Sequence, residues 1–285
     1  MAPGAPIEIQ GHRGWRAAWP ENTLAGFRAL WAAGFRVAEL DVGLTSEGIA
    51  VLCHDPALDP DLTRGPDGAW IEHGPILHHT GWQALCRYDV GRPRPGGRTA
   101  LAFARQRPVD GARVPTLQEV LQEAPADAVL DVEIKTDPAH PELTASPARM
   151  VAAVLAVAGT DPRLRLRAFD WRVLEAALPS LGAARLSWLS DAQTEAAPSL
   201  WWGRAEASPL EAMLACGAFG GTWAPDAATL TEALVQDAQT LGLRVAPWTV
   251  NEAAAMRRLA DWGVEAICTD DPALARATLA HTSLA

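Results

Sequence analysis

The 285-residue chain carries 34 acidic and 24 basic side chains, so its formal net charge at neutral pH is −10. A field of this sign repels nucleic acids and anionic membrane surfaces, and we expect no nucleic-acid partner. Hydrophobic residues make up 49% of the chain, which suffices for a sizeable core, and the length suits either two small domains or one α/β barrel of about 250 residues.

The N-terminal segment shows neither the basic nor the apolar region of a signal peptide. The longest apolar stretch, residues 150–159, is too short to span a bilayer. We therefore expect a soluble, cytoplasmic protein without stable membrane insertion. The four cysteines are scattered without metal-binding spacing and are expected to be reduced thiols. The sequence does not predict the oligomeric state.

Short β-like runs alternate with longer helical segments along the whole chain. The order begins with a strand over 7–10, a helix over 23–33 and strands over 37–42 and 49–53. Further strands are expected over 129–134, 164–169, 185–189, 218–223, 244–248 and 266–269, with alanine-rich helical stretches between them. Repeated βα units indicate a parallel sheet.

Several strands end on residues that can carry chemistry. These residues are His12, Asp41, Glu133, Trp248 and Asp270, on early and late strands alike. A (β/α)8 barrel gathers its site at the carboxyl ends of all its strands, whereas an open doubly wound sheet uses one switch point. The pattern therefore predicts a single (β/α)8 TIM-barrel domain over residues 1–285.

The segment 56–114 interrupts this alternation. It is rich in Pro, Gly and Arg and shows little sustained periodicity. We interpret it as a small insertion after the second βα region. At the catalytic end of a barrel such a segment either caps the site and selects the substrate, or is only a structural excursion.

A possible metal site begins with Glu39 and Asp41, which lie two apart on a predicted strand and so face the same side. Alone, such a pair is weak evidence. Glu133 adds a carboxylate from another strand and Glu21 one from a loop, and these oxygens suit a hard cation such as Mg²⁺ or Ca²⁺.

Two histidines, His12 and His54, end short apolar runs, and each is followed by a charged residue. Histidine titrates near neutral pH, so one can take a proton while the other gives one. Because three carboxylates and Arg13 accompany the two histidines in the sequence, a catalytic role is favoured over a structural one.

Nine short motifs occur in an order that matches one family. They include His-Arg-Gly at 12–14, Pro-Glu-Asn-Thr-Leu at 20–24, Glu-x-Asp-Val at 39–42, His-Asp-x-x-Leu at 54–58 and Glu-Ile-Lys at 133–135. The others lie at 45–48, 114–121, 248–251 and 269–272. Over essentially its whole length the chain resembles the glycerophosphodiester phosphodiesterases.

The resemblance implies a (β/α)8 barrel that hydrolyses small glycerophosphodiesters to glycerol 3-phosphate and an alcohol. It implies one divalent cation, Mg²⁺ or Ca²⁺, with Mn²⁺ as a further candidate. By similarity, the metal ligands are Glu39, Asp41 and Glu133, the phosphate-binding residues are Arg13 and Lys135, the acid/base pair is His12 and His54, Trp248 lines the site, and Glu21 and Asn22 support it. The order in which the histidines act is left open.

The sequence leaves two alternative functions. One is a lysophospholipase D of the same family, which an apolar groove above the metal would favour. The other is a non-catalytic phosphate-binding barrel, which is disfavoured because both histidines and every proposed metal ligand are present. Asn22 is expected to orient Glu21 or Arg13, and Trp201 and Trp202 to form a loop packed on the barrel.

Overall fold

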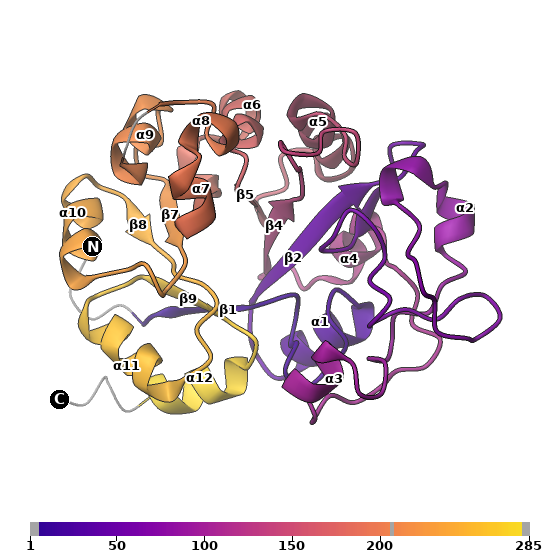
Figure 1. Ribbon diagram of the computed structural model, residues 1–285. Helices are drawn as coiled ribbons and strands as arrows, with labels where there is room; N and C mark the ends of the chain where they lie inside the picture. Colours follow the sequence, from indigo (N-terminus) through magenta and orange to yellow (C-terminus); the bar gives the residue numbers. More distant parts are fainter. Residues whose placement is uncertain (1–5, 206–207, 281–285) are drawn as a thin grey trace.

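The computed structural model describes residues 6–205 and 208–280, which form a (β/α)8 barrel (Figure 1). Its parallel strands are β1 Glu8–Gly11, β2 Val37–Leu44, β4 Val129–Ile134, β5 Leu164–Ala168, β6 Leu186–Ser190, β7 Thr222–Pro225, β8 Arg244–Val245 and β9 Ala266–Thr269. The ladder runs β8-β7-β6-β5-β4-β2-β1-β9. Backbone hydrogen bonds from Glu265 to Val245 and from Cys268 to Pro247 close the barrel between β8 and β9. The predicted fold class is confirmed.

Helices surround this sheet on its outer side (Figure 1). They are α1 Leu24–Ala32, α4 Leu117–Glu123, α5 Pro147–Ala158, α6 Trp171–Leu181, α7 Ala192–Ala196, α8 Pro198–Trp201, α9 Pro209–Ala215, α10 Glu232–Thr240, α11 Ala253–Asp261 and α12 Pro272–Leu279, with a 3-10 turn over Ala183–Arg185. None of the helices in the described part of the chain has the length and apolar character needed to cross a membrane.

One predicted strand lies outside the barrel. The run over 49–53 forms β3, Ala50–Leu52, which pairs with β2 in the antiparallel direction. Only five residues separate the two strands, and a parallel crossover needs about a dozen or more. Gly48, at φ 84°, instead turns the chain back on itself, so β2 and β3 make a hairpin.

Two late strands differ in extent from the prediction. The run expected over 218–223 becomes β7 at Thr222–Pro225, because Gly217 and Gly220 both take positive φ and turn the chain before it. The run expected over 244–248 is regular only at Arg244–Val245 and continues as an irregular segment to Trp248, which bridges to Asp226.

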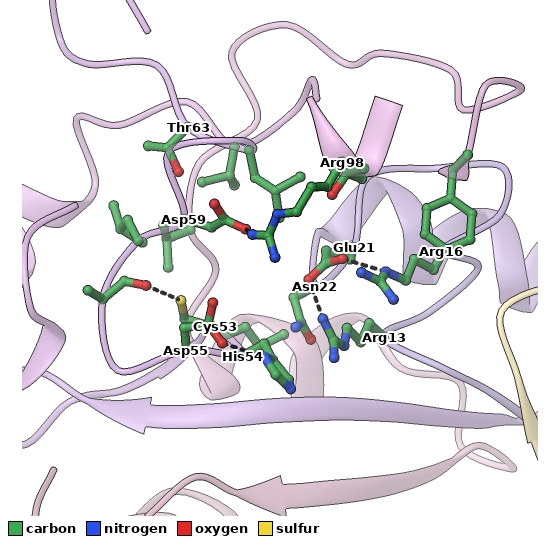
Figure 2. A pocket seen from close by; sticks show the side chains of 18 of the residues that line it. Arg13, Arg16, Glu21, Asn22, Cys53, His54, Asp55, Asp59, Thr63 and Arg98 are labelled. Atoms are coloured by element: carbon green, nitrogen blue, oxygen red, sulfur yellow. Dashed lines mark hydrogen bonds and ion pairs between the residues drawn. The ribbon is translucent and has the colours of Figure 1, made fainter. Parts of the chain in front are cut away.

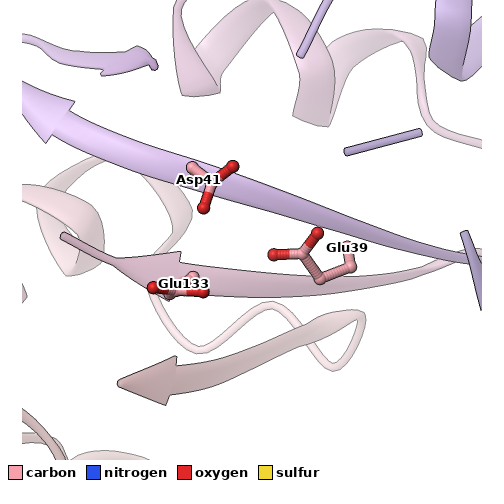
Figure 3. A group of neighbouring side chains, drawn as sticks. All are labelled: Glu39, Asp41 and Glu133. Carbon is pink, nitrogen blue, oxygen red and sulfur yellow. The ribbon is translucent and has the colours of Figure 1, made fainter. Parts of the chain in front are cut away.

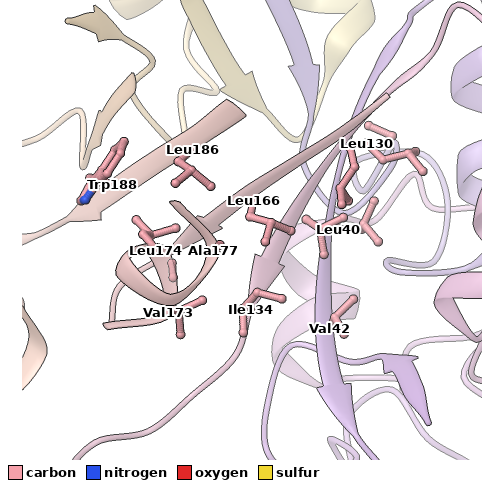
Figure 4. Packing of buried hydrophobic residues seen from close by; sticks show 14 of the residues in the cluster. Leu40, Val42, Leu130, Ile134, Leu166, Val173, Leu174, Ala177, Leu186 and Trp188 are labelled. Atoms are coloured by element: carbon pink, nitrogen blue, oxygen red, sulfur yellow. The ribbon is translucent and has the colours of Figure 1, made fainter. Parts of the chain in front are cut away.

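The main hydrophobic core lies between the barrel and its helices. Figure 4 shows Leu40 and Val42 of β2, together with Leu130 and Ile134 of β4, on the outer face of the strands. Alternate residues on the same strands, among them Glu39 and Asp131, point the other way and are also buried. The strands are therefore buried on both faces, apolar outside and polar inside.

The segment 56–114 folds as a compact excursion beside the barrel, drawn in purple and magenta in Figure 1. It contains a 3-10 turn at Leu77–His79 and the short helices α2 Trp82–Leu85 and α3 Arg98–Ala102. Leu58, Leu77, Leu85 and Val114 form a second hydrophobic cluster with Val51 of β3.

Two hydrogen bonds tie the end of this segment to the loop after β1. Gln106 donates to the carbonyl of Arg16, and the backbone N–H of Arg107 donates to the carbonyl of Ala18. The segment is therefore fixed against the mouth of the barrel.

Candidate active site

The loop after β1 makes a tight turn at His12-Arg13-Gly14. Arg13 has φ 51° and Gly14 has φ 90°, and the backbone N–H of Arg13 donates to Glu39 Oε2 over 2.8 Å. A Cβ on Gly11 would lie 2.4 Å from the carbonyl oxygen of Gly14, so the turn needs glycine there. This turn aims both the imidazole and the guanidinium at the carboxyl end of the barrel.

His12 is held by a carboxylate from the last strand. Its Nδ1 lies 2.7 Å from Asp270 Oδ1, and the amide of Asn251 donates to the other oxygen of Asp270 over 2.7 Å. Burial and the charge of Arg13 lower the pKa of His12, and the contact with Asp270 offsets part of that effect. The Nδ1 contact fixes the orientation of the ring.

Arg13 is surrounded by acidic groups. Its Nη1 donates to Glu21 Oε1 over 2.7 Å, and its Nε lies 3.3 Å from Asp41 Oδ2. Arg16 pairs with the other oxygen of Glu21. Both oxygens of Glu21 are thus engaged by guanidinium groups, and this carboxylate holds Arg13 in place.

Three carboxylates, on Glu39, Asp41 and Glu133, converge at the centre of the mouth (Figure 3). Each contributes an oxygen, and these atoms lie within 4.8 Å of one another. The register of the sheet causes this, because Asp41 pairs with Glu133 across β2 and β4 and Glu39 lies two residues earlier on the same face.

The three groups fit a hard cation. Glu39 Oε1 is buried and has no hydrogen-bond partner among the described residues. Burial and the neighbouring charge of Asp41 raise the pKa of Glu39 well above its usual range. A buried, unpartnered carboxylate oxygen beside two like charges is the arrangement that a divalent cation relieves, so the triad could hold a metal ion.

Asn22 corrects one expectation. Its amide donates to Asp41 Oδ2 over 2.8 Å and its side-chain oxygen accepts from the backbone N–H of Asp41, so it orients Asp41 rather than Glu21 or Arg13. Its φ of 51° suits asparagine, which tolerates the left-handed region. Thr23 then caps α1, with its hydroxyl accepting from the N–H of Gly26.

Lys135 extends from the end of β4 into the same site. Its Nζ pairs with Glu133 Oε1 and lies 3.7 Å from Asp41 Oδ1. Its Nζ also lies 5.9 Å from the centroid of the Phe169 ring, and Phe169 meets Trp248 edge to face at 5.3 Å. Trp248 is fixed because its Nε1 donates to the carbonyl of Ala224.

The loop expected at Trp201 and Trp202 is in part a helix end, because Trp201 is the last residue of α8 and Trp202 lies in the turn after it. Trp201 ends α8 and packs against Phe169, whereas Trp202 is fully buried and stacks on Trp171 at a centroid distance of 4.4 Å. Trp202 therefore belongs to the core. Trp201 and Trp248 both pack against Phe169, so the three rings form one aromatic cluster.

His54 follows β3 and lies on the other side of the site. Its Nδ1 contacts Asp55 Oδ1 at 2.6 Å, and its side chain is 36% exposed. It borders a cavity of about 390 Å³ between the barrel and the segment 56–114, shown with Arg13 and Glu21 in Figure 2.

The site residues proposed from the sequence thus all lie at one end of the barrel, in or around the acidic triad. The sequence assigns no individual role to Arg16, to Asn251 of the motif at 248–251, or to the buried Arg167, which lies 3.6 Å from Asp131. Asp270 was recognised as a strand-end residue, but its contact with His12 joins the two ends of the chain and has no local sequence signal.

The sequence model of the Glycerophosphoryl diester phosphodiesterase family matches residues 12–274. A probable glycerophosphodiester phosphodiesterase 2 of Mycobacterium tuberculosis is 26% identical over 270 residues, which are 94% of this chain and 89% of that protein. The human glycerophosphoinositol inositolphosphodiesterase GDPD2 is 34% identical over 141 residues, which are 47% of this chain and only 25% of that larger protein.

Solved structures agree over the full fold. A putative glycerophosphoryl diester phosphodiesterase from Silicibacter pomeroyi is 33% identical with a TM-score of 0.88, covering 99% of this chain and 95% of that one. An Oleispira antarctica phosphodiesterase, in complex with the product sn-glycerol-3-phosphate, shares the fold at 21% identity and a TM-score of 0.71, covering 96% of this chain and 97% of that one. The present chain belongs to the glycerophosphoryl diester phosphodiesterase family.

Proposed function

We propose that this protein hydrolyses small glycerophosphodiesters to sn-glycerol 3-phosphate and an alcohol, with one divalent cation and with His12 and His54 as the acid/base pair. The observation that carries the proposal is the convergence of two histidines, two cationic side chains and three carboxylates at one barrel mouth. The bound sn-glycerol-3-phosphate of the Oleispira antarctica relative supports this product class.

The phosphate-binding groups in this proposal are Arg13 and Lys135. Both border the triad, since Arg13 lies near Asp41 Oδ2 and Lys135 near Asp41 Oδ1. Arginine offers a planar fork that can hold two phosphate oxygens, whereas lysine acts as a point charge. A phosphate between them would take over contacts that the two side chains now make with carboxylates.

The metal-binding residues are Glu39, Asp41 and Glu133. Their oxygen-only donor set favours Mg²⁺ or Ca²⁺, with Mn²⁺ as a further candidate. When bound, the cation supplies positive charge to the phosphate oxygens as negative charge develops on them.

The histidines would move the protons. The glycerol 2-hydroxyl attacks phosphorus as one histidine accepts its proton. The bond from phosphorus to the alcohol oxygen breaks, and the other histidine protonates that oxygen. Water then opens the resulting cyclic phosphate, which restores both protonation states and yields glycerol 3-phosphate. His12, fixed by Asp270, and His54, at the cavity, suit transfers at two different oxygens.

The test is glycerol 3-phosphate release from glycerophosphocholine and glycerophosphoethanolamine, after EDTA and after return of Mg²⁺, Ca²⁺ or Mn²⁺. We expect metal-restored release, and no release with any metal contradicts the proposal. Lysophosphatidylcholine is assayed in parallel. Formation of lysophosphatidic acid from it, without turnover of the small diesters, identifies a lysophospholipase D instead.

His54→Ala tests the acid/base assignment. We expect kcat to fall by at least about 10²-fold while substrate binding persists, because a positioned proton carrier contributes about 10²–10⁴-fold. His73→Ala is the matched control, since His73 is an exposed histidine of the segment 56–114. A near-normal kcat for His54→Ala removes His54 from the mechanism.

A further inference from the structure

The cavity beside His54 borders the proposed reacting centre, since Arg13 and His54 belong to both. Arg13 and His54 line one end of it, and Figure 2 shows Thr63 on the opposite side. Its volume of about 390 Å³ falls within the range of about 300–1,000 Å³ typical of small-molecule sites. A group esterified to a phosphate held by Arg13 would therefore enter this space directly.

The walls of the cavity are mainly apolar and firmly packed. Leu52, Leu58 and Val114 line it and are almost fully buried, and two of these, Leu58 and Val114, belong to the second hydrophobic cluster. Val90 and Phe103 add apolar surface from the segment 56–114. Because close-packed side chains resist displacement, this is a preformed apolar space.

Most of the charged groups around the cavity are paired, and Asp55 contacts His54 through one of its two oxygens. Both oxygens of Glu21 accept from arginines, and those of Asp59 accept from the backbone N–H of Asp61 and from Arg98. The face of Phe103 carries the guanidinium of Arg16 at 4.7 Å. A quaternary ammonium would find no uncommitted oxygen on Glu21 or Asp59 and no open face on Phe103, and Asp55 is the one lining carboxylate among the described residues that keeps an oxygen without a hydrogen-bond partner.

A buried hydroxyl on the far side of the cavity from His54 is available to a ligand. Thr63 is 1% exposed, lines the cavity, and its hydroxyl has no hydrogen-bond partner among the described residues. Unpartnered buried hydroxyls are costly, so this atom suits a hydroxyl or ether oxygen of an occupant.

We propose that this cavity binds the leaving alcohol of the substrate and selects an uncharged alcohol with a mainly apolar body, larger than ethanolamine or choline. The inference rests on the proposed glycerophosphodiester hydrolysis. The glycerol half carries two hydroxyls that apolar walls would leave unpaired, so the leaving alcohol is the half that gains from the cavity. This placement sets His54 beside the departing oxygen.

The experiment compares glycerophosphodiesters of ethanol, 1-butanol and 1-hexanol, whose leaving alcohols have similar acidity, with glycerophosphocholine. The readout is kcat/KM for glycerol 3-phosphate release with metal present. We expect kcat/KM to rise roughly fourfold per added methylene, the factor that apolar burial gives, and the hexanol diester to exceed glycerophosphocholine. Turnover that is equal across the alcohol series overturns the proposal and leaves the hydrolytic function standing.

Ala102→Trp fills the cavity from α3, where Ala102 is exposed at its edge. We expect the ratio of kcat/KM for the hexanol and ethanol diesters to fall at least tenfold. Leu101→Trp is the matched control, because Leu101 is 75% exposed and does not line the cavity, and it should leave that ratio unchanged.

Three other results overturn the proposal. An unchanged ratio in Ala102→Trp shows that the alcohol lies elsewhere. Selective loss of lysophosphatidylcholine turnover in this variant, with a flat alcohol series, assigns the cavity to an acyl chain on the glycerol. No release from any diester with any metal overturns the proposed function and this subsite together.

Discussion

Asp270 shows how one side chain can set the orientation of a proposed catalytic group. One oxygen of Asp270 contacts Nδ1 of His12, and the other accepts a hydrogen bond from the side-chain amide of Asn251. The imidazole is therefore held by a carboxylate that is itself fixed. In the proposed reaction Asp270 is a positioning residue, because it acts on the substrate only through His12.

Asp270→Asn should therefore lower kcat by at least about 10²-fold, because an amide can hold the ring in the wrong tautomer. Loss of the negative charge also lowers the pKa of His12 further, so the limb of the pH–rate profile that reports His12 should move to lower pH. Asp261→Asn, at the exposed end of α11, is the control. An unmoved limb together with unchanged kcat would refute the positioning role.

Neutralising one carboxylate of the acidic triad should weaken metal binding without lowering the stability of the metal-free protein. Glu39→Gln removes a proposed ligand, and we expect metal affinity to fall at least tenfold by elemental analysis and titration. In the absence of metal the same variant should be as stable as the parent or more stable, because burial and Asp41 already disfavour a charge on Glu39. Glu142→Gln, on the surface, is the control. Unchanged metal content would contradict the ligand assignment.

At this scale, sequence reasoning works where the signal is local. The two-residue spacing of Glu39 and Asp41 is readable because a strand has a period of two. The partner of Asn22 is not readable, since its contact with Asp41 depends on how the loop after β1 meets β2. The ion-pair partner of Arg167 is likewise unpredictable from the sequence, because the pairing of β4 with β5 brings Arg167 near Asp131.

At the scale of elements, the hairpin β2–β3 determines where His54 lies. The backbone N–H of Cys53 donates to the carbonyl of Asp41, so the residue before His54 is tied to the strand that carries the acidic pair. The strand over 49–53 could be predicted from its apolar run, but its antiparallel direction follows from the short connection, which a reading of alternating βα units overlooks.

The segment 56–114 depends on a close backbone approach at Gly91. A Cβ there would lie 1.8 Å from the carbonyl oxygen of Val109, whose own N–H donates to the carbonyl of Gly91. Gly91→Ala should therefore lower the stability of this segment by roughly 1–3 kcal/mol or more, while the barrel stays folded. Limited proteolysis should show faster cleavage within 56–114 and an unchanged barrel core. Protease resistance equal to that of the parent would count against this packing.

At the scale of the whole molecule, the fold class can be predicted from the sequence, because each βα unit has a local hydrophobic pattern and the units repeat. The strand ends were less accurate, since glycine turns such as Gly220 decide them. The charged barrel interior was not anticipated. Buried strands of such barrels are commonly filled with branched apolar residues, whereas this interior holds Gln10, Asp131 and Arg167.

Ion pairs also link distant strands near the start of the barrel. Arg165 of β5 donates two hydrogen bonds to the carboxylate of Glu8 on β1, at 2.8 and 2.7 Å, and Arg244 of β8 lies 4.0 Å from the same group. Burial opposes ionisation of Glu8, but the hydrogen bonds and charge of Arg165 outweigh it and lower its pKa. One carboxylate thus connects three strands that are far apart in the sequence.

This connection makes the stability of the barrel depend on pH. Because the pKa of Glu8 is lower in the folded than in the unfolded chain, its stabilisation is complete above the ordinary value of 4.5 and is lost as pH falls through the folded value. Glu8→Gln should lower stability by about 1–3 kcal/mol at pH 7, and its Tm should approach that of the parent below about pH 4. Glu142→Gln should show no such convergence. A Tm difference that is constant from pH 7 to pH 3 would mean that the charge of Glu8 does not stabilise the barrel.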